Sequence, residues 1–255
     1  MLFLIGLGLS EGDISLRAIE IAKKADKLFL DPYTNRVSSN YINYLEKILG
    51  KGIAKLSRSD LEENVKATLE YAKNKAVVIF VMGDPLIATT HNTIIDLAQK
   101  MGIVVRVIHA PSIFTAAIGE SGLDIYRFGP TTTIPFWSEK YKPVSFIDVI
   151  NKNLQNNQHT LVLLDYNYKE DRAMSLGEAI DLLNKAQEER KINIIQKILV
   201  LADVGKESED IVYADIHTLS KISERFKGKL ISLIIPSNPN FAEAESLSKY
   251  TISSI

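Results

Sequence analysis

The chain has 255 residues, of which 46% are hydrophobic and 24% charged, a composition typical of a globular protein with an ample core. Its net charge is −1 and it carries no basic run, which argues against nucleic-acid binding. It has no cysteine, so disulfides, thiolate metal sites and cysteine nucleophiles are excluded.

The chain start, MLFLIGLGLSEGD, is apolar but lacks the basic residues that open a signal peptide, and we interpret it as a buried first strand. No stretch reaches the roughly 20 apolar residues that cross a bilayer. We therefore expect a cytoplasmic protein with no membrane or nucleic-acid partner.

Strand-like and helix-like segments alternate through the first half of the chain. Short apolar runs predict strands at 2–6, 27–31, 53–56, 76–82 and 103–109. Apolar residues at helical spacing predict helices at 13–25, 39–50, 61–74 and 91–101. Asp13, Asp60, and either Thr89 or Thr90 are expected to cap the first, third and fourth of these helices. Apolar strands separated by helices are typical of a largely parallel sheet covered on both faces.

The stretch VMGDPLIATTH, residues 81–91, is typical of a binding loop at a strand end. Pro85 prevents the strand from continuing directly into a helix, and Asp84 stands beside a buried strand terminus. The loops GLGLS, GDPLIATT and HAPSI, which follow the first, fourth and fifth strands, all carry small residues. Because ligands gather at the carboxyl ends of strands in open α/β sheets, these loops predict a site for a small molecule.

The sequence changes in character after the fifth strand. Residues 110–136 are rich in Gly, Pro, Ser and Thr, and we interpret them as a connection into a second unit. Helices are then predicted at 145–157, 175–190, 215–226 and 240–250, and strands at 159–165, 197–203, 210–215 and 229–236. Two of these strands have no helix between them, which predicts antiparallel pairing and a mixed sheet. We expect two α/β domains, residues 1–112 and 113–255.

Several familiar motifs are missing from the chain. The glycine pattern GLGLSEG has Glu11 where a dinucleotide fingerprint needs its third glycine, so we interpret it as a tight turn. There is no P-loop, nucleophile elbow or zinc-protease motif. The histidines, His91, His109, His159 and His217, lack metal-ligand spacing, so no metal is expected. We interpret them as structural or surface residues, leaving a further role open for His91 alone.

Four blocks of sequence, LFLIGLGL, GDPLIATTH, VIHAPSIFTAAIGESGLDIYRFG and HTLVLLD, resemble the diphthine synthases in order and spacing over nearly the whole chain. That family belongs to the larger group of tetrapyrrole-type methyltransferases. The resemblance implies two α/β domains of the tetrapyrrole methylase type, the first with a largely parallel sheet and the second with a mixed one. It also implies that S-adenosyl-L-methionine (SAM) binds in a cleft between them and leaves as S-adenosyl-L-homocysteine.

The activity implied by the resemblance is trimethylation of the amino group of the 3-amino-3-carboxypropyl-modified histidine of translation elongation factor 2. The product is diphthine, an intermediate of diphthamide biosynthesis, and the enzyme is expected to be a homodimer. Carried over by motif, the implied cofactor residues are Leu9, Asp84, Ile87, Ser112, Ile113, Leu164, Val204 and Ile231. Asp203 and Ile231 depart from the family pattern, in which arginine and often histidine stand at these positions.

Methyl transfer from a sulfonium mainly requires alignment of the reacting atoms, which can lower a barrier by about 7–11 kcal/mol. The amine must also lose protons, and Asp165, His91 and Tyr33 are candidate relays. Water is sufficient in principle, so no catalytic residue is assigned. Two alternatives stay open: a corrin or porphyrin-precursor methyltransferase of the same fold, and a nucleotide-binding regulatory protein.

Overall fold

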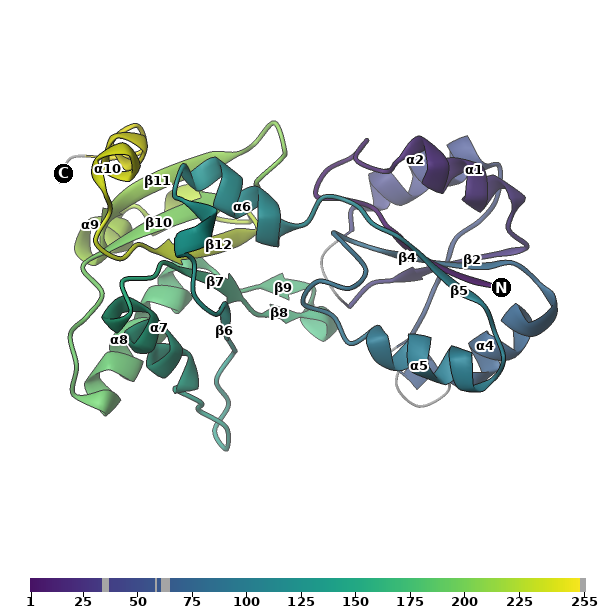
Figure 1. Ribbon diagram of the computed structural model, residues 1–255, viewed down its shortest axis with the longest axis horizontal. Coiled ribbons are helices and arrows are strands. Elements are labelled where there is room, and N and C mark those ends of the chain that lie inside the picture. The colour runs from purple at the N-terminus through teal and green to yellow at the C-terminus, as the bar shows by residue number, and fades with distance from the viewer. Residues whose placement is uncertain (34–36, 58, 61–64, 253–255) are drawn as a thin grey trace. The chain divides into compact units, whose positions relative to one another are not determined.

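The computed structural model describes the chain except for residues 34–36, 58, 61–64 and 253–255 (Figure 1). The chain divides into two compact units, Met1–Ser112 and Ile113–Ile255. Each unit is built around a five-stranded sheet.

The sheet of the first unit is entirely parallel. Its strands are β1 (Leu2–Gly6), β2 (Lys27–Asp31), β3 (Ala54–Lys55), β4 (Val77–Val81) and β5 (Val105–Ile108). They lie in the order β3-β2-β4-β1-β5. The helices are α1 (Leu16–Lys24), α2 (Ser39–Leu49), α4 (Val65–Asn74) and α5 (Asn92–Lys100). The predicted parallel sheet is confirmed.

Both faces of this sheet are covered by helices, as Figure 1 shows. On one face, Ala18 of α1 and Leu45 of α2 are buried in a cluster with Phe80. On the other face, Leu69 of α4 is buried in a cluster with Ile79 and with α5. All of β4 is buried, because it lies in the middle of the sheet with helices on both sides. This environment explains why its sequence is a continuous apolar run.

The sequence predicted that Asp13 caps α1, but Asp13 does not do so. Ser15 does so, since its hydroxyl accepts a hydrogen bond from the N–H of Ala18 at 3.2 Å. The carboxylate of Asp13 turns back instead and accepts from the N–H groups of Leu9 at 2.8 Å and Ser10 at 2.9 Å. The prediction was wrong because a short acidic side chain can satisfy the N–H groups of a neighbouring turn as readily as those of a helix.

The predicted cap of α5 is also wrong. His91 is the N-cap residue, and its side chain makes no capping hydrogen bond; the hydroxyl of Thr89 accepts only a long bond, 3.5 Å, from the N–H of His91 itself. The hydroxyl of Thr89 donates to the carbonyl four residues earlier at 2.6 Å, and Thr90 contributes only its backbone to the turn. The start of the third predicted helix, 61–64, which Asp60 was expected to cap, lies outside the described residues.

The second unit contains a mixed sheet. Its strands are β6 (Thr132–Ile134), β7 (Thr160–Leu164), β10 (Lys197–Ala202), β11 (Asp210–Asp215) and β12 (Ile231–Ile235), in the order β11-β10-β12-β7-β6. Strand β12 runs antiparallel to both neighbours, β10 and β11 are antiparallel, and β6 is parallel to β7. The predicted antiparallel pairing is confirmed.

The helices of this unit are α6 (Ile113–Ser121), α7 (Ser145–Gln155), α8 (Leu176–Arg190), α9 (Ile216–Lys221) and α10 (Phe241–Ser248). Short 3-10 turns lie at Ile125–Arg127, Tyr168–Glu170 and Ser223–Phe226, and a small ribbon pairs β8 (Tyr166–Asn167) with β9 (Arg172–Ala173). The interpretation of 110–136 as a simple connection was incomplete, because this stretch forms α6 and β6. The sequence of α6, IFTAAIGES, is apolar over most of its length and gives little amphipathic signal.

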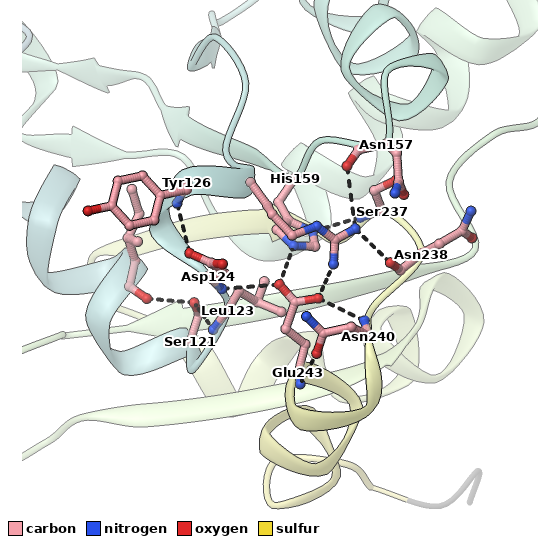
Figure 2. A network of polar contacts seen from close by, with 12 residues as sticks. Ser121, Leu123, Asp124, Tyr126, Asn157, His159, Ser237, Asn238, Asn240 and Glu243 are labelled. Atoms are coloured by element: carbon pink, nitrogen blue, oxygen red, sulfur yellow. Dashed lines mark hydrogen bonds and ion pairs between the residues drawn. The ribbon is translucent and has the colours of Figure 1, made fainter.

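A polar network lies at the edge of this sheet where β7 begins and β12 ends (Figure 2). The buried carboxylate of Glu243 accepts hydrogen bonds from Nε2 of His159 at 3.0 Å and from the N–H of Asn240 at 2.8 Å, and it pairs with Arg127. The N–H of Ser237 donates to Nδ1 of His159 at 2.9 Å. His159 is therefore held as a neutral ring that carries its proton on Nε2. Burial lowers its pKa, outweighing the opposite effect of Glu243.

Candidate functional site

The loops that follow β1 and β4 are joined at the carboxyl edge of the first sheet. The N–H of Gly83 donates to the carbonyl of Gly8 at 2.8 Å, and the N–H of Gly8 donates to the carbonyl of Gly83 at 3.3 Å. Both residues have positive φ, 79° and 70°, which glycine adopts without steric cost. The first two of the three loops predicted to form a site therefore lie against each other.

Asp84 joins the third loop to this pair. Its side chain is only 6% exposed. Oδ1 accepts from the N–H of Leu86 at 2.9 Å, and Oδ2 accepts from the N–H of Ala110 at 3.2 Å. Oδ2 also lies 2.7 Å from Nδ1 of His109. Asp84 thus fixes its own loop and connects it to HAPSI.

This connection passes over the end of β1, which lies between β4 and β5. The last residue of β1 is Gly6, and a Cβ atom there would lie 2.6 Å from the carbonyl oxygen of Gly83 and 2.7 Å from Cβ of Ala110. Only a residue without a side chain leaves room for the loops to meet at this point.

Four of the residues expected to bind a cofactor lie on these loops. Leu9 is half-buried, and its N–H is already bonded to Asp13. Ile87 is 40% exposed although it is a large apolar residue, and Ser112 is buried at the end of the HAPSI loop. Together with Asp84, they stand on loops at one edge of the first sheet. Ile113 follows directly in sequence as the first residue of α6.

The other three expected residues share one edge of the second sheet. Leu164 ends β7, Val204 follows the end of β10, and Ile231 begins β12. The antiparallel register places Ile231 opposite Ala202, and the next residue of β12 opposite Leu163. Strands β7 and β10 therefore end where β12 begins.

Asp203 stabilises this edge of the second sheet through hydrogen bonds to Leu230. It has a positive φ of 50°, its N–H donates to the carbonyl of Leu230 at 2.8 Å, and its Oδ1 accepts from the N–H of Leu230 at 3.1 Å. Burial alone raises the Asp203 pKa, but hydrogen bonds from Lys206, Ser208 and Leu230 outweigh it and hold the pKa below its usual value. The departure from the family pattern at this position thus has a local structural role.

The three candidate proton relays differ in their surroundings. His91 is 3% exposed, with Nδ1 2.8 Å from the carbonyl of Pro85 and Nε2 3.1 Å from Oδ2 of Asp31. Asp165, after β7, accepts from a backbone N–H at 2.9 Å. Tyr33 is half-buried, and its N–H donates to Asp31 at 2.7 Å. Of the three, His91 is the one with both ring nitrogens in contact with protein oxygens.

His109 is the residue whose surroundings the sequence did not predict. Its side chain is 68% exposed, although its Nδ1 is bonded to a buried carboxylate. The sequence feature that could have drawn attention to His109 was its position as the first residue of the HAPSI loop, directly after β5. Its partner stands 25 residues earlier, in the loop after β4, and β4 is not adjacent to β5 in the sheet, so sequence proximity gave no indication of the pair.

No group of three or more metal-ligating side chains occurs within the described part of the chain. Over the same residues, no helix has the length and apolar character needed to span a membrane.

Comparison with known proteins identifies the family. Residues 1–220 match the Tetrapyrrole (Corrin/Porphyrin) Methylases. The chain is 39% identical over 261 residues to a diphthine synthase of Methanocaldococcus jannaschii, and 38% identical over 259 residues to one of Methanococcus maripaludis. Both alignments cover 100% of each chain.

A crystal structure of a diphthine synthase superposes with a TM-score of 0.87 and 33% identity, covering 98% of this chain and 95% of the other. The paired glycine loops, the GDP turn and the mixed second sheet thus occur in a chain that matches such enzymes from end to end. The chain belongs to the diphthine synthase family of tetrapyrrole methylases, the SAM-dependent methyltransferases of diphthamide biosynthesis.

Proposed function

We propose that this enzyme transfers three methyl groups to the amino group of the 3-amino-3-carboxypropyl-modified histidine of translation elongation factor 2. The observation that carries the proposal is the end-to-end identity of 38–39% to proteins named diphthine synthase. A corrin or porphyrin substrate is supported only by the wider family, whose match ends at residue 220, before β12 and α10. The similarity over the complete chain favours the protein substrate.

The residues at the first sheet edge fit SAM as the methyl donor. Apart from Gly83 and its two chain neighbours, no atom of the described residues lies within 4 Å of the position that a Cβ of Gly83 would occupy, so a ligand can approach this backbone closely. Ile87 offers exposed apolar surface on the same loop. When bound, SAM supplies a methyl group activated by a sulfonium. The residues proposed to hold it are Leu9, Asp84, Ile87 and Ser112 of the first unit and Ile113, Leu164, Val204 and Ile231 of the second.

Asp84 contributes to this site in two ways. Its hydrogen bonds shape the loop, and a carboxylate oxygen has a second lone pair with which it can accept a bond from a ligand. Asp84→Ala is therefore expected to weaken SAM binding by about 1.5–3 kcal/mol, the scale of hydrogen bonds to charged groups. Calorimetry measures this loss. Asp96→Ala, at an exposed position of α5, is the matched control and should bind SAM normally. If Asp84→Ala bound SAM with wild-type affinity, Asp84 would serve only to shape its turn and would not contribute to SAM binding.

The substrate is tested by incubating the enzyme with SAM and elongation factor 2 that carries the aminocarboxypropyl histidine. Mass spectrometry of the peptide should show one, two and finally three added methyl groups. A porphyrin precursor offered under the same conditions should gain none. Methylation of the precursor, with none of the factor, would establish the alternative substrate.

We also propose that the enzyme is a homodimer in the cytoplasm, the compartment where its protein substrate works. The chain has a mass of 28.5 kDa. Light scattering coupled to gel filtration is expected to give twice that mass, and a mass of one chain would contradict the dimer.

A further inference from the structure

We propose that His109 is the proton acceptor for the substrate amine, and that Asp84 holds its ring in the orientation that this task requires. The inference rests on the proposed function, because it concerns the protons that the amine must lose. It adds a catalytic residue that the sequence motifs did not assign.

The geometry is that of a base with an orienting partner. Nδ1 of His109 lies 2.7 Å from Oδ2 of Asp84, and the carboxylate is 6% exposed whereas the imidazole is 68% exposed. A carboxylate accepts hydrogen bonds, so Nδ1 carries the proton. In the neutral ring, the lone pair then resides on Nε2. A buried acid fixes the tautomer in this way in nucleophile–base–acid sites and around metal-bound histidines.

The other histidines are not placed for this role. His91 is buried, with both nitrogens engaged by protein groups. His159 is likewise buried, with its nitrogens held by Ser237 and Glu243. His217 is exposed on α9, without a carboxylate partner within the described residues. Only His109 combines a fixed tautomer with an accessible second nitrogen.

The position of His109 agrees with the proposed reaction. It follows the last residue of β5, and Asp84 ties its loop to the two loops that carry Leu9 and Ile87. In open α/β sheets, ligands bind at this carboxyl edge. The exposed imidazole of His109 therefore belongs to the same edge of the sheet as the residues proposed to bind SAM.

The proton balance requires an acceptor in each cycle. An amino group of the α type is mostly protonated at neutral pH. Before each transfer, one N–H bond of the ammonium breaks, the proton passes to Nε2, and the electron pair stays on the amine nitrogen. That pair forms the new nitrogen–carbon bond, while the pair of the carbon–sulfur bond leaves with the sulfur. His109 returns the proton to water, and after the third transfer no N–H remains.

The test compares two substitutions of His109 with a matched control. Asparagine preserves a donor for Asp84 but has no second nitrogen that can act as a base, so His109→Asn separates the loop contact from proton transfer. His109→Ala opens space that added imidazole can fill. His217→Asn makes the same chemical change at an exposed position outside the site. Each variant is assayed for kcat and KM on the modified elongation factor, for SAM binding by calorimetry and for thermal stability.

We expect His109→Asn to bind SAM within about threefold of the wild type and to melt normally, but to lose about 10²-fold or more in kcat, the usual scale of general base catalysis. Imidazole should partly restore His109→Ala, and His217→Asn should behave as the wild type. Wild-type kcat in His109→Asn would overturn the proposal, as would a loss that arises entirely from weaker SAM binding. If the wild-type enzyme itself methylated no factor, the proposed substrate would be wrong and this inference would fail with it.

A second measurement needs neither SAM nor substrate. Nitrogen NMR of the free enzyme should show His109 with its proton on Nδ1 when the ring is neutral. In Asp84→Asn this preference should weaken, because the carboxylate acceptor is lost. A proton on Nε2 in the wild type would contradict the orienting role of Asp84.

Discussion

Replacing Glu243 with alanine is expected to destabilise the second unit severely, because this carboxylate is 2% exposed and satisfies four donors. Two are side chains, Arg127 and Nε2 of His159, the latter at 3.0 Å. Two are backbone N–H groups, of Asp124 at 3.1 Å and of Asn240 at 2.8 Å. Each loses its partner in the variant.

The magnitude follows from what remains after the substitution. Removing one partner of a buried ion pair typically costs about 3–5 kcal/mol, because the other charge stays without compensation. The guanidinium of Arg127 keeps hydrogen bonds to the carbonyls of Asn238, at 2.8 Å, and Asn157, at 3.4 Å, but these supply no opposite charge. We therefore expect a loss of about 3–5 kcal/mol for Glu243→Ala. Glu243→Gln keeps the shape and part of the hydrogen bonding, so its loss should be smaller.

Urea denaturation can report on the second unit selectively. The chain has a single tryptophan, Trp137, which packs against the core of that unit. Its fluorescence follows unfolding there, and the midpoint multiplied by the slope gives the free energy of unfolding. Glu224→Ala is the control, because Glu224 of the same unit also pairs with a cation, Lys227, but both side chains are more than 80% exposed. Exposed pairs of this kind contribute about 0–1 kcal/mol. A loss below about 1 kcal/mol in Glu243→Ala would refute the reasoning.

Two further predictions concern protonation and packing. Burial lowers the pKa of His159 in the folded protein below its ordinary value of 6.5. As the pH falls, His159 is therefore protonated in the unfolded chain before it is protonated in the folded protein, which favours unfolding. The contribution of His159 to stability is full above about pH 6.5 and is lost as the pH falls below it. The urea midpoint should therefore drop between pH 7.5 and 5.5, and a variant His159→Gln should show a flatter profile. Gly6→Ala should destabilise the first unit by about 1–3 kcal/mol and weaken SAM binding, because its methyl group meets a carbonyl and another Cβ. Gly119→Ala, in open space on α6, should not lower the melting temperature or weaken calorimetric SAM binding, because alanine favours a helix over glycine, and equal losses in both variants would contradict the packing argument.

Much of the fold could be predicted from local sequence patterns. The parallel sheet was predictable because its strands are continuous apolar runs separated by amphipathic helices, and the mixed sheet because β10 and β11 follow one another without a helix. Helix α6 was missed because it is apolar nearly all round, and β6 because three residues give no periodicity.

The candidate site was only partly predictable. The loops could be placed at one sheet edge from the strand order typical of such folds, but the partners of individual side chains could not. Asp13 bonds the glycine turn instead of its helix, and Asp84 reaches across an intervening strand to His109. These choices depend on distances between loops that the one-dimensional sequence does not contain. The cofactor contacts themselves remain predictions.

The place of β1 in its sheet has a consequence for how the protein is made. This strand comes first along the chain but pairs with β4 and β5, with Leu2 opposite both Val77 and Val105. During synthesis, an apolar segment must therefore remain without its partners until much of the first unit has left the ribosome. Pairing over such long separations is slow to form, and an unpaired apolar strand is prone to aggregate while it waits. We therefore expect chaperones to assist the folding of the first unit during translation, by shielding β1 until β4 and β5 have been synthesised.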